Sequence, residues 1–131
     1  MDKKACPDFC PCGTNKKYTV CCAPYLEGAA IAPTAEILMR SRYTAYTLVR
    51  ELYLLATWHT STRPSSLGFE GEPPTQWIGL ELKRHEQQDE NRAIVEFVAR
   101  YKVNGRAHRL HEVSRFVRED GWWFYVNGDV A

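Results

Sequence analysis

The spacing of apolar residues changes from helical to alternating near the middle of the chain. Between Thr34 and Trp58 the apolar positions recur at helical intervals, at Leu38, Ala45, Val49, Leu52, Tyr53 and Ala56. No proline or glycine interrupts this segment, so the pattern predicts one continuous helix over residues 34–58. Thr34 is a suitable N-cap, and Glu36 falls in the first turn, where the helix dipole favours an acidic side chain.

The second half of the chain alternates apolar and polar residues, which predicts β-strands. We expect four strands, over residues 77–83, 93–103, 107–117 and 122–126. Asn104-Gly105 and Asp120-Gly121 are strong signals for two-residue hairpin turns. Residues 85–91 are charged and predict a surface turn, while the glycines and prolines of residues 65–75 predict a long loop. The pattern therefore predicts a meander of four antiparallel strands.

The two hairpin turns determine the register of the predicted sheet. With two residues in the first turn, Phe97 lies opposite Glu112 and Val95 lies opposite Ser114. With two residues in the second turn, Ser114 lies opposite Asn127. One face of the sheet then places Glu112, Ser114 and Asn127 among apolar residues, namely Val95, Phe97, Ala99, Leu110, Phe116, Trp123 and Tyr125. A helix that covers this curved face gives an α+β fold.

The N-terminal segment carries the clearest chemical signal. All five cysteines lie within the first 22 residues, and four of them form a C-x-C pair and a C-C pair with eight residues between them. Gly13 can turn the chain so that the two pairs face each other. Four thiolates make a tetrahedral site that favours zinc, so we predict one structural zinc ion held by Cys10, Cys12, Cys21 and Cys22. A disulfide cluster or free thiols are the alternatives, and Cys6 is expected to stay outside the ligand set.

Length and charge limit the remaining classes. A chain of 131 residues allows a small appendage, residues 1–28, and one domain, residues 29–131. Seventeen basic and sixteen acidic residues give a net charge of +1, which argues against non-specific binding to nucleic acid or membranes. No leader peptide and no apolar run of about 20 residues is seen, so we expect a cytoplasmic, reducing environment.

Residues 10–22 resemble the SEC-C motif, a short zinc-binding module. The C-P-C-G opening, the K-K-Y interior and the C-C close stand in this sequence, whereas Thr14-Asn15 and Thr19-Val20 depart from the usual pattern. The resemblance implies a protein partner, because SEC-C modules serve docking. Lys16 and Lys17 would then face an acidic surface on that partner.

The chain as a whole resembles the YchJ-type family of uncharacterised bacterial proteins, in which a SEC-C knuckle precedes a nuclear-transport-factor-2-like domain. The resemblance rests on the knuckle and on segments 38–46, 57–59, 76–80, 95–100 and 112–116. It implies a cone of curved sheet closed by an N-terminal helix. Longer relatives carry a second cysteine knuckle at the C-terminus, and this chain has no cysteine after Cys22.

Two functions from different classes follow. The first is a zinc-dependent protein–protein interaction module. The second is a small-molecule-binding or isomerase/hydratase-like pocket in the cone, with Glu112 as acid or base. The candidate pocket residues are Arg42, Tyr43, Tyr46, Trp58, His59, Trp77, Phe97, Glu112, Ser114, Trp123 and Tyr125. An ion pair of Glu112 with Arg40 or Arg42 is the structural alternative. No catalytic triad is evident and four cysteines leave zinc no open position, so the sequence favours binding over catalysis.

Overall fold

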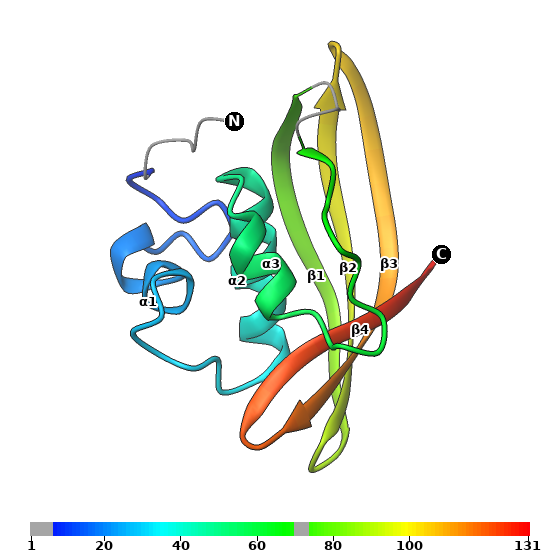
Figure 1. Cartoon of the computed structure of the whole chain (residues 1–131). Helices are drawn as coiled ribbons and strands as arrows, with labels where there is room; N and C mark the ends of the chain where they lie inside the picture. The colour runs from blue at the N-terminus through cyan, green and yellow to red at the C-terminus, as the bar shows by residue number, and fades with distance from the viewer. Residues whose placement is uncertain (1–6, 70–73) are drawn as a thin grey trace.

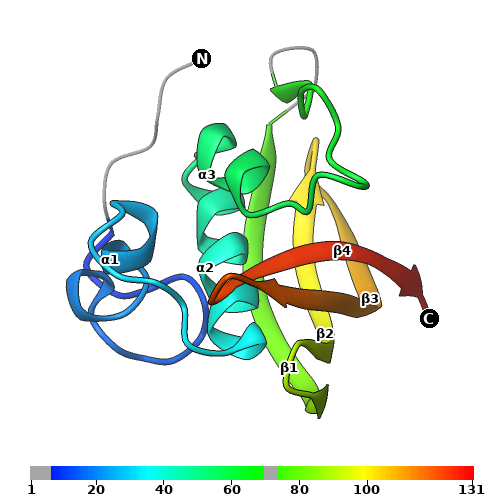
Figure 2. The same ribbon diagram turned by 60° about the horizontal axis from the view of Figure 1, so that its bottom comes forward.

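The main element of the protein is a curved sheet of four antiparallel strands (Figure 1). The computed structural model describes residues 7–69 and 74–131, so Cys6 and residues 70–73 of the predicted loop lie outside the described residues. The strands lie in the sheet in chain order and are β1 (Thr75–Asp89), β2 (Arg92–Val103), β3 (Arg106–Glu119) and β4 (Trp122–Val130). The helices pack on one face of the sheet (Figures 1 and 2), which confirms the predicted α+β class and the meander.

The hairpin turns form as their residues predict. Asn104 and Gly105 have φ values of 52° and 77°, and Asp120 and Gly121 have φ values of 53° and 83°. Two successive positive φ values define a type I′ turn, whose twist matches that of the flanking strands. The predicted pairing of Phe97 with Glu112 is confirmed.

Strand β1 is longer than the alternation predicts. The predicted turn over residues 85–91 is wrong, because the strand continues to Asp89 and only Glu90 and Asn91 turn the chain. His85 still pairs with Val95 of β2. Since β1 is an edge strand, its charged side chains reach water while its backbone stays bonded to β2, and such charges suit an exposed edge.

A bulge in β4 makes the register at the end of the sheet differ from the predicted one. Arg115 pairs with Asn127, whereas Phe116 pairs with Tyr125, so Val126 is an extra residue on β4. Ser114 consequently lies opposite Gly128 and not opposite Asn127. A bulge turns every later side chain of its strand to the other face.

The predicted single helix is two helices, α2 (Ala35–Thr47) and α3 (Glu51–Ala56). The side chain of Thr34 accepts a hydrogen bond from the Ile37 amide at 3.1 Å, so the predicted N-cap is confirmed. At the other end Val49 adopts a left-handed φ of 57°, and the Arg50 amide donates to the Ala45 carbonyl at 2.8 Å. This is the Schellman C-cap, which usually carries glycine, so valine gave no signal of the break.

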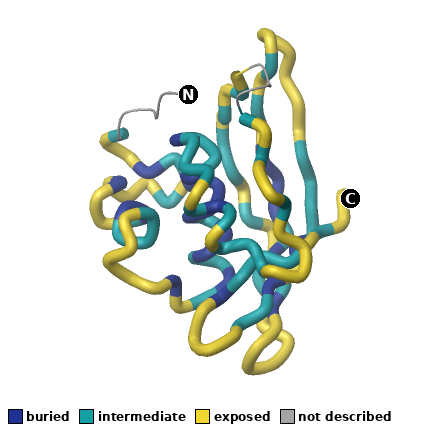
Figure 3. Tube along the Cα trace, viewed as in Figure 1, coloured by how far each residue is buried: buried dark blue, intermediate teal, exposed yellow. Residues whose placement is uncertain are grey.

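The N-terminal segment, residues 7–28, packs against α2 and β1. It contains the short helices η1 (Tyr18–Val20) and α1 (Ala23–Leu26). The Arg40 guanidinium of α2 donates to the Cys12 carbonyl at 2.7 Å. Cys10, Cys12 and Cys22 belong to the same buried cluster as residues of α2 and the sheet, and Figure 3 shows buried positions along these elements. The predicted domain boundary after residue 28 stays a prediction. Residues before and after it contribute to one buried core.

In the described ranges, no helix is long and apolar enough to cross a bilayer.

Gly13 tests how closely the N-terminal segment approaches β1. Its φ is +90°, and a Cβ there would lie 3.0 Å from the Leu80 carbonyl oxygen. Gly28, with φ +79° and nothing within 4 Å, is the matched control. We expect Gly28→Ala to lower the free energy of unfolding by about 1 kcal/mol, from backbone strain alone. Gly13→Ala should cost about 2–3 kcal/mol, because the backbone of β1 must also move. Equal losses in urea unfolding would contradict this contact.

Candidate functional site

The cysteine cluster is the first candidate site. The sulfur atoms of Cys10, Cys12, Cys21 and Cys22 all lie within 4.8 Å of one another, and the four thiols are free. The Sγ atoms of Cys12 and Cys21 are 3.6 Å apart. In a tetrahedral site with metal–sulfur bonds of about 2.3 Å, the sulfurs lie about 3.8 Å apart. The four cysteines can therefore hold a metal ion, and the spacing is too long for a disulfide.

Local backbone structure brings the two cysteine pairs together. Gly13 and Asn15 have positive φ values, so the chain reverses directly after Cys12. The Cys10 amide donates to the Lys16 carbonyl at 2.8 Å, which closes the turn. The second pair follows η1, and Cys22 directly precedes the first residue of α1. A turn and two short helices thus bring the four sulfur atoms close together.

Two threonine hydroxyls contact the sulfur atoms from outside the cluster. Thr14 Oγ1 lies 3.1 Å from Cys21 Sγ. Thr44 Oγ1, which is completely buried on α2, donates to Cys22 Sγ at 3.3 Å. Hydrogen bonds to ligand atoms orient them and tune a metal site. Thr44 therefore links the cluster to the helix that forms the centre of the fold.

The thiol pKa values differ strongly across the cluster. Hydrogen bonds from Cys10 and then from Cys22 hold the pKa of Cys12 well below its usual value. Burial raises the pKa of Cys21 to about 11. The Cys12 sulfur thus carries negative charge readily, while the raised pKa of Cys21 favours its protonated form. A cation among them would favour the thiolate form of all four, so metal binding would release protons.

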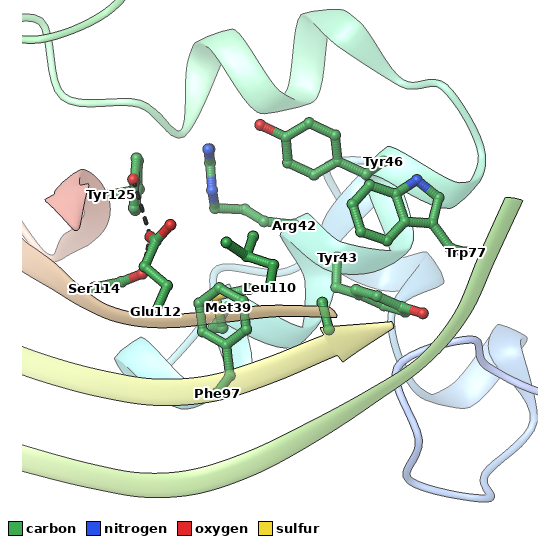
Figure 4. A pocket seen from close by; sticks show the side chains of 11 residues that line it. Met39, Arg42, Tyr43, Tyr46, Trp77, Phe97, Leu110, Glu112, Ser114 and Tyr125 are labelled. Carbon is green, nitrogen blue, oxygen red and sulfur yellow. Dashed lines mark hydrogen bonds between the residues drawn. The ribbon is translucent and has the colours of Figure 1, made fainter. Parts of the chain in front are cut away.

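A pocket between α2 and the concave face of the sheet is the second candidate site (Figure 4). Its volume is about 280 Å³. Eight of the eleven candidate pocket residues line it, and these are Arg42, Tyr43, Tyr46, Trp77, Phe97, Glu112, Ser114 and Tyr125. Met39, Ala99 and Leu110 complete the lining. The predicted register placed Ala99 and Leu110 on this face, but none of the three was a candidate pocket residue, because aliphatic side chains carry no chemical signal.

The remaining three candidates lie elsewhere. The Trp58 ring packs edge-on against Tyr125 at 5.0 Å, behind the pocket lining. His59 Nε2 lies 2.9 Å from a carboxylate oxygen of Glu119 at the surface. Trp123 is buried in the core, and its indole donates to the Pro33 carbonyl at 3.3 Å. Thr57 and His59 pair with β4 through their backbone, which turns the His59 side chain away from the pocket.

Glu112 is held by neutral donors and not by an arginine. Its Oε2 accepts hydrogen bonds from Ser114 Oγ at 2.5 Å and from the Tyr125 hydroxyl at 3.3 Å. Burial, and then the charge of Glu112, raises the pKa of Tyr125, so this phenol keeps its proton. Among the described residues Glu112 forms no ion pair, so the predicted pairing with Arg40 or Arg42 is absent. Arg40 pairs instead with Glu36.

Arg42 is buried, and no carboxylate within residues 7–69 or 74–131 forms an ion pair with it. Only 3% of the residue is exposed, and Nη1 donates to the Leu54 carbonyl at 2.8 Å and to Thr57 Oγ1 at 2.6 Å. The guanidinium carbon lies 5.1 Å from the Trp58 ring and 4.8 Å from the Tyr125 ring. Burial lowers the pKa of Arg42, but an arginine stays charged at neutral pH. Carbonyl and aromatic groups therefore hold this cation.

Gly128 is a site residue that sequence reasoning missed. A Cβ at this position would overlap the Glu112 carboxylate and lie 2.8 Å from its Cγ. The absence of a side chain leaves room for Glu112 beside Ser114, which is the partner of Gly128 across the sheet. Only the bulge at Val126 brings Gly128 to this face, and a bulge leaves no clear signal in the sequence.

Comparison with known proteins identifies the family. A family model described as YchJ, middle NTF2-like domain, matches residues 34–128. The chain belongs to this family. UPF0225 protein RSc0270 of Ralstonia nicotianae is 56% identical, over 93% of this chain and 91% of its own length. A UPF0225 protein of Chromobacterium violaceum is 55% identical over 98% of each chain.

Two solved structures resemble this YchJ-type chain over almost its whole length. One is the solution structure of RPA3114, a SEC-C motif containing protein from Rhodopseudomonas palustris, with a TM-score of 0.83 and 30% identity. The match covers 94% of this chain and 98% of that protein. The other is the crystal structure of a SEC-C motif containing protein from Psychrobacter arcticus, with a TM-score of 0.79 and 29% identity. That match covers 96% of this chain and 84% of the other.

The room beside Gly128 can be tested in this YchJ-type protein. We expect Gly128→Ala to displace the Glu112 carboxylate from Ser114 and to lower the free energy of unfolding by about 1–3 kcal/mol. Gly79→Ala is the control, because Gly79 is also a strand glycine and nothing lies within 4 Å of its added Cβ. That change should be neutral or slightly stabilising. Urea unfolding measures both, and an unchanged stability of Gly128→Ala would contradict the predicted overlap.

Proposed function

We propose that this protein is a zinc-dependent protein-interaction module, in which the metal holds the N-terminal segment against α2 and so presents its outer surface to a partner. The proposal rests on the observation that the N-terminal segment has a buried side and an exposed side. The cysteines point inward, while Phe9 and Val20 are 65% and 70% exposed. Lys16 and Lys17 are exposed beside them.

The donor set supports zinc as the metal. Four sulfurs with no oxygen or nitrogen ligand favour zinc over harder cations, and a closed four-cysteine site is typical of structural zinc. The solved relatives are described as SEC-C motif containing proteins, and this agrees with a shared cysteine site. Four clustered free thiols also suit a reducing compartment, which supports a cytoplasmic location.

The exposed residues Phe9, Lys16, Lys17 and Val20, here called the outer knuckle face, are contiguous. Phe9 and Lys17 pair as an isolated β-bridge, and the Val20 amide donates to the Lys17 carbonyl at 3.1 Å. Large exposed apolar residues beside charges are typical of contact surfaces. The whole chain has a net charge of only +1, so the local pair of lysines favours a protein with an acidic patch around an apolar contact.

Metal analysis tests the site. After purification without added zinc we expect about one zinc ion per chain, the stoichiometry of a closed four-ligand site. Cys12→Ser and Cys22→Ser should each lose the metal, while Cys6→Ser should retain it. Retention by Cys12→Ser together with loss by Cys6→Ser would show that the ligand set is wrong.

Charge reversal tests the docking surface. We expect the double variant Lys16→Glu, Lys17→Glu to keep its zinc and its melting temperature but to lose proteins that co-purify with the tagged wild type. The double variant Lys102→Glu, Arg106→Glu is the matched control, because it makes the same change of charge on exposed residues of the β2–β3 hairpin. Cys21→Ser, Cys22→Ser should lose the same proteins as the lysine variant. Recovery of one set of proteins by all four chains would contradict docking through the outer knuckle face.

A further inference from the structure

Two opposite charges line the same pocket and both contact Tyr125, but they form no ion pair with each other. The hydrogen bonds of Arg42 to Leu54 and Thr57 leave from Nη1, and those of Glu112 arrive at Oε2. Figure 4 shows both charged groups at the same end of the pocket, beside Tyr125 and near the hydroxyl of Tyr46. Among the described residues no ion pair joins Arg42 to Glu112.

This arrangement leaves spare hydrogen-bonding capacity on two charged residues that line the pocket. A carboxylate has two acceptor oxygens and a guanidinium has five N–H donors. Arg42 also forms a side-chain hydrogen bond with Tyr46, which offsets part of the rise that burial causes in the pKa of Tyr46. The remaining N–H donors of Arg42 and Oε1 of Glu112 are not used by these bonds. Buried polar groups are normally paired, so a ligand that supplies one donor and one acceptor would complete this end of the pocket.

We propose that the pocket binds a small, neutral, planar molecule with an amide-like edge, such as an aromatic carboxamide or a lactam, whose N–H donates to Glu112 and whose carbonyl accepts from Arg42. The edge bridges the two charges, and each of its hydrogen bonds involves an ionised partner, which makes it stronger than a neutral pair. This site is separate from the proposed docking surface and does not depend on it.

The charges of the pocket select a neutral ligand. Arg42 and Glu112 together carry no net charge, so an anion or a cation would bring an uncompensated charge into a largely apolar site. Burying an unbalanced charge costs much more than burying a dipole whose ends are both hydrogen-bonded. A neutral amide therefore fits better than a carboxylate or an amidine of the same shape.

The walls of the pocket select a flat ligand. Tyr43, Tyr46 and Trp77 contact one another, with ring centroids 5.6 Å apart for Tyr43 and Trp77 and 5.9 Å apart for Tyr46 and Trp77. Phe97 lines the pocket from the sheet. Rings that pack on each other keep their orientation, and aromatic faces favour stacking with another ring. The volume of 280 Å³ equals that of about nine water molecules, which suits one ring or a fused pair.

The polar end of the pocket is already in position. Thr57 and the Leu54 carbonyl hold Nη1 of Arg42, and two aromatic rings cover its guanidinium. Ser114 and Tyr125 hold the Glu112 carboxylate. A ligand would therefore cause little reorganisation, and preorganised groups bind with less loss of entropy.

A set of isosteric probes tests the proposal. Benzamide, benzoate and benzamidine share a ring and differ in charge. Amide NMR spectra of the full-length protein should show benzamide shifting the Trp77 indole signal at millimolar concentration. Benzoate and benzamidine should bind at least tenfold more weakly. Equal or tighter binding of either ion would overturn the proposal, and so would the absence of any shift at Trp77 with benzamide.

Replacement of Glu112 tests whether its negative charge causes the preference for a neutral ligand. Glu112→Gln keeps the shape of the side chain but leaves the charge of Arg42 uncompensated, so benzoate should now bind more tightly than benzamide. Glu96→Gln is the control, because Glu96 also lies on a central strand and pairs with His111 at 2.7 Å outside the pocket. The control should keep the preference of the wild type for benzamide. An unchanged preference in a folded Glu112→Gln variant would overturn the role of Glu112, and the probe series on the wild type decides the proposal if that variant does not fold.

Discussion

The burial of α2 between the cysteine cluster and the concave face of the sheet is the constraint on which the rest of the structure depends. Residues four apart share a helix face, and α2 uses two such pairs in different ways. Arg40 and Thr44 reach the N-terminal segment, through the Cys12 carbonyl and the Cys22 sulfur. Arg42 and Tyr46 line the pocket on the other side. Arginine and threonine interrupt the apolar stripe of α2 because these side chains form specific polar contacts on both faces of the helix.

The buried guanidinium of Arg42 shows how the fold compensates for this. An unpaired buried charge is costly, and the usual partner would be a carboxylate. Here the partner is the Leu54 carbonyl, which belongs to α3. That carbonyl is in reach because the chain breaks at Val49 and α3 turns back beside α2. The left-handed Val49 and the buried Arg42 therefore depend on each other. The break at Val49 lets α3 fold beside α2, where the Leu54 carbonyl accepts a hydrogen bond from Arg42.

The sequence predicts those features of the protein that depend on local chemistry. The hairpin turns follow from Asn104-Gly105 and Asp120-Gly121, because these residues tolerate positive φ, and the pairing of Phe97 with Glu112 follows from the turn length. The C-x-C and C-C spacing likewise predicts a cluster of four sulfurs.

The features that the sequence does not predict depend on tertiary contacts. Valine rarely adopts a left-handed conformation, and at Val49 backbone hydrogen bonds from Val49 to Tyr46 and from Arg50 to Ala45 accompany it. The charged end of β1 stays extended because β2 offers it hydrogen bonds. The bulge at Val126 places Gly128, and not Asn127, opposite Ser114 and beside the Glu112 side chain. Eight lining residues of the pocket could be named from the sequence, five from the strands and three from the helix. The position of Gly128 beside Glu112 could not, because it depends on the bulge.

The cysteine cluster and the pocket share the position of α2. Thr44 contacts a sulfur, while its neighbour Tyr43 lines the pocket and packs on Trp77. Protein interiors are close-packed, so a displacement of the helix at Thr44 also moves Tyr43. A metal ion held by the cysteines would therefore support the wall of the pocket as well as the N-terminal segment. This gives a physical reason for one small chain to join a cysteine knuckle to a cone-shaped domain, since the knuckle packs on the outer side of the helix that closes the cone.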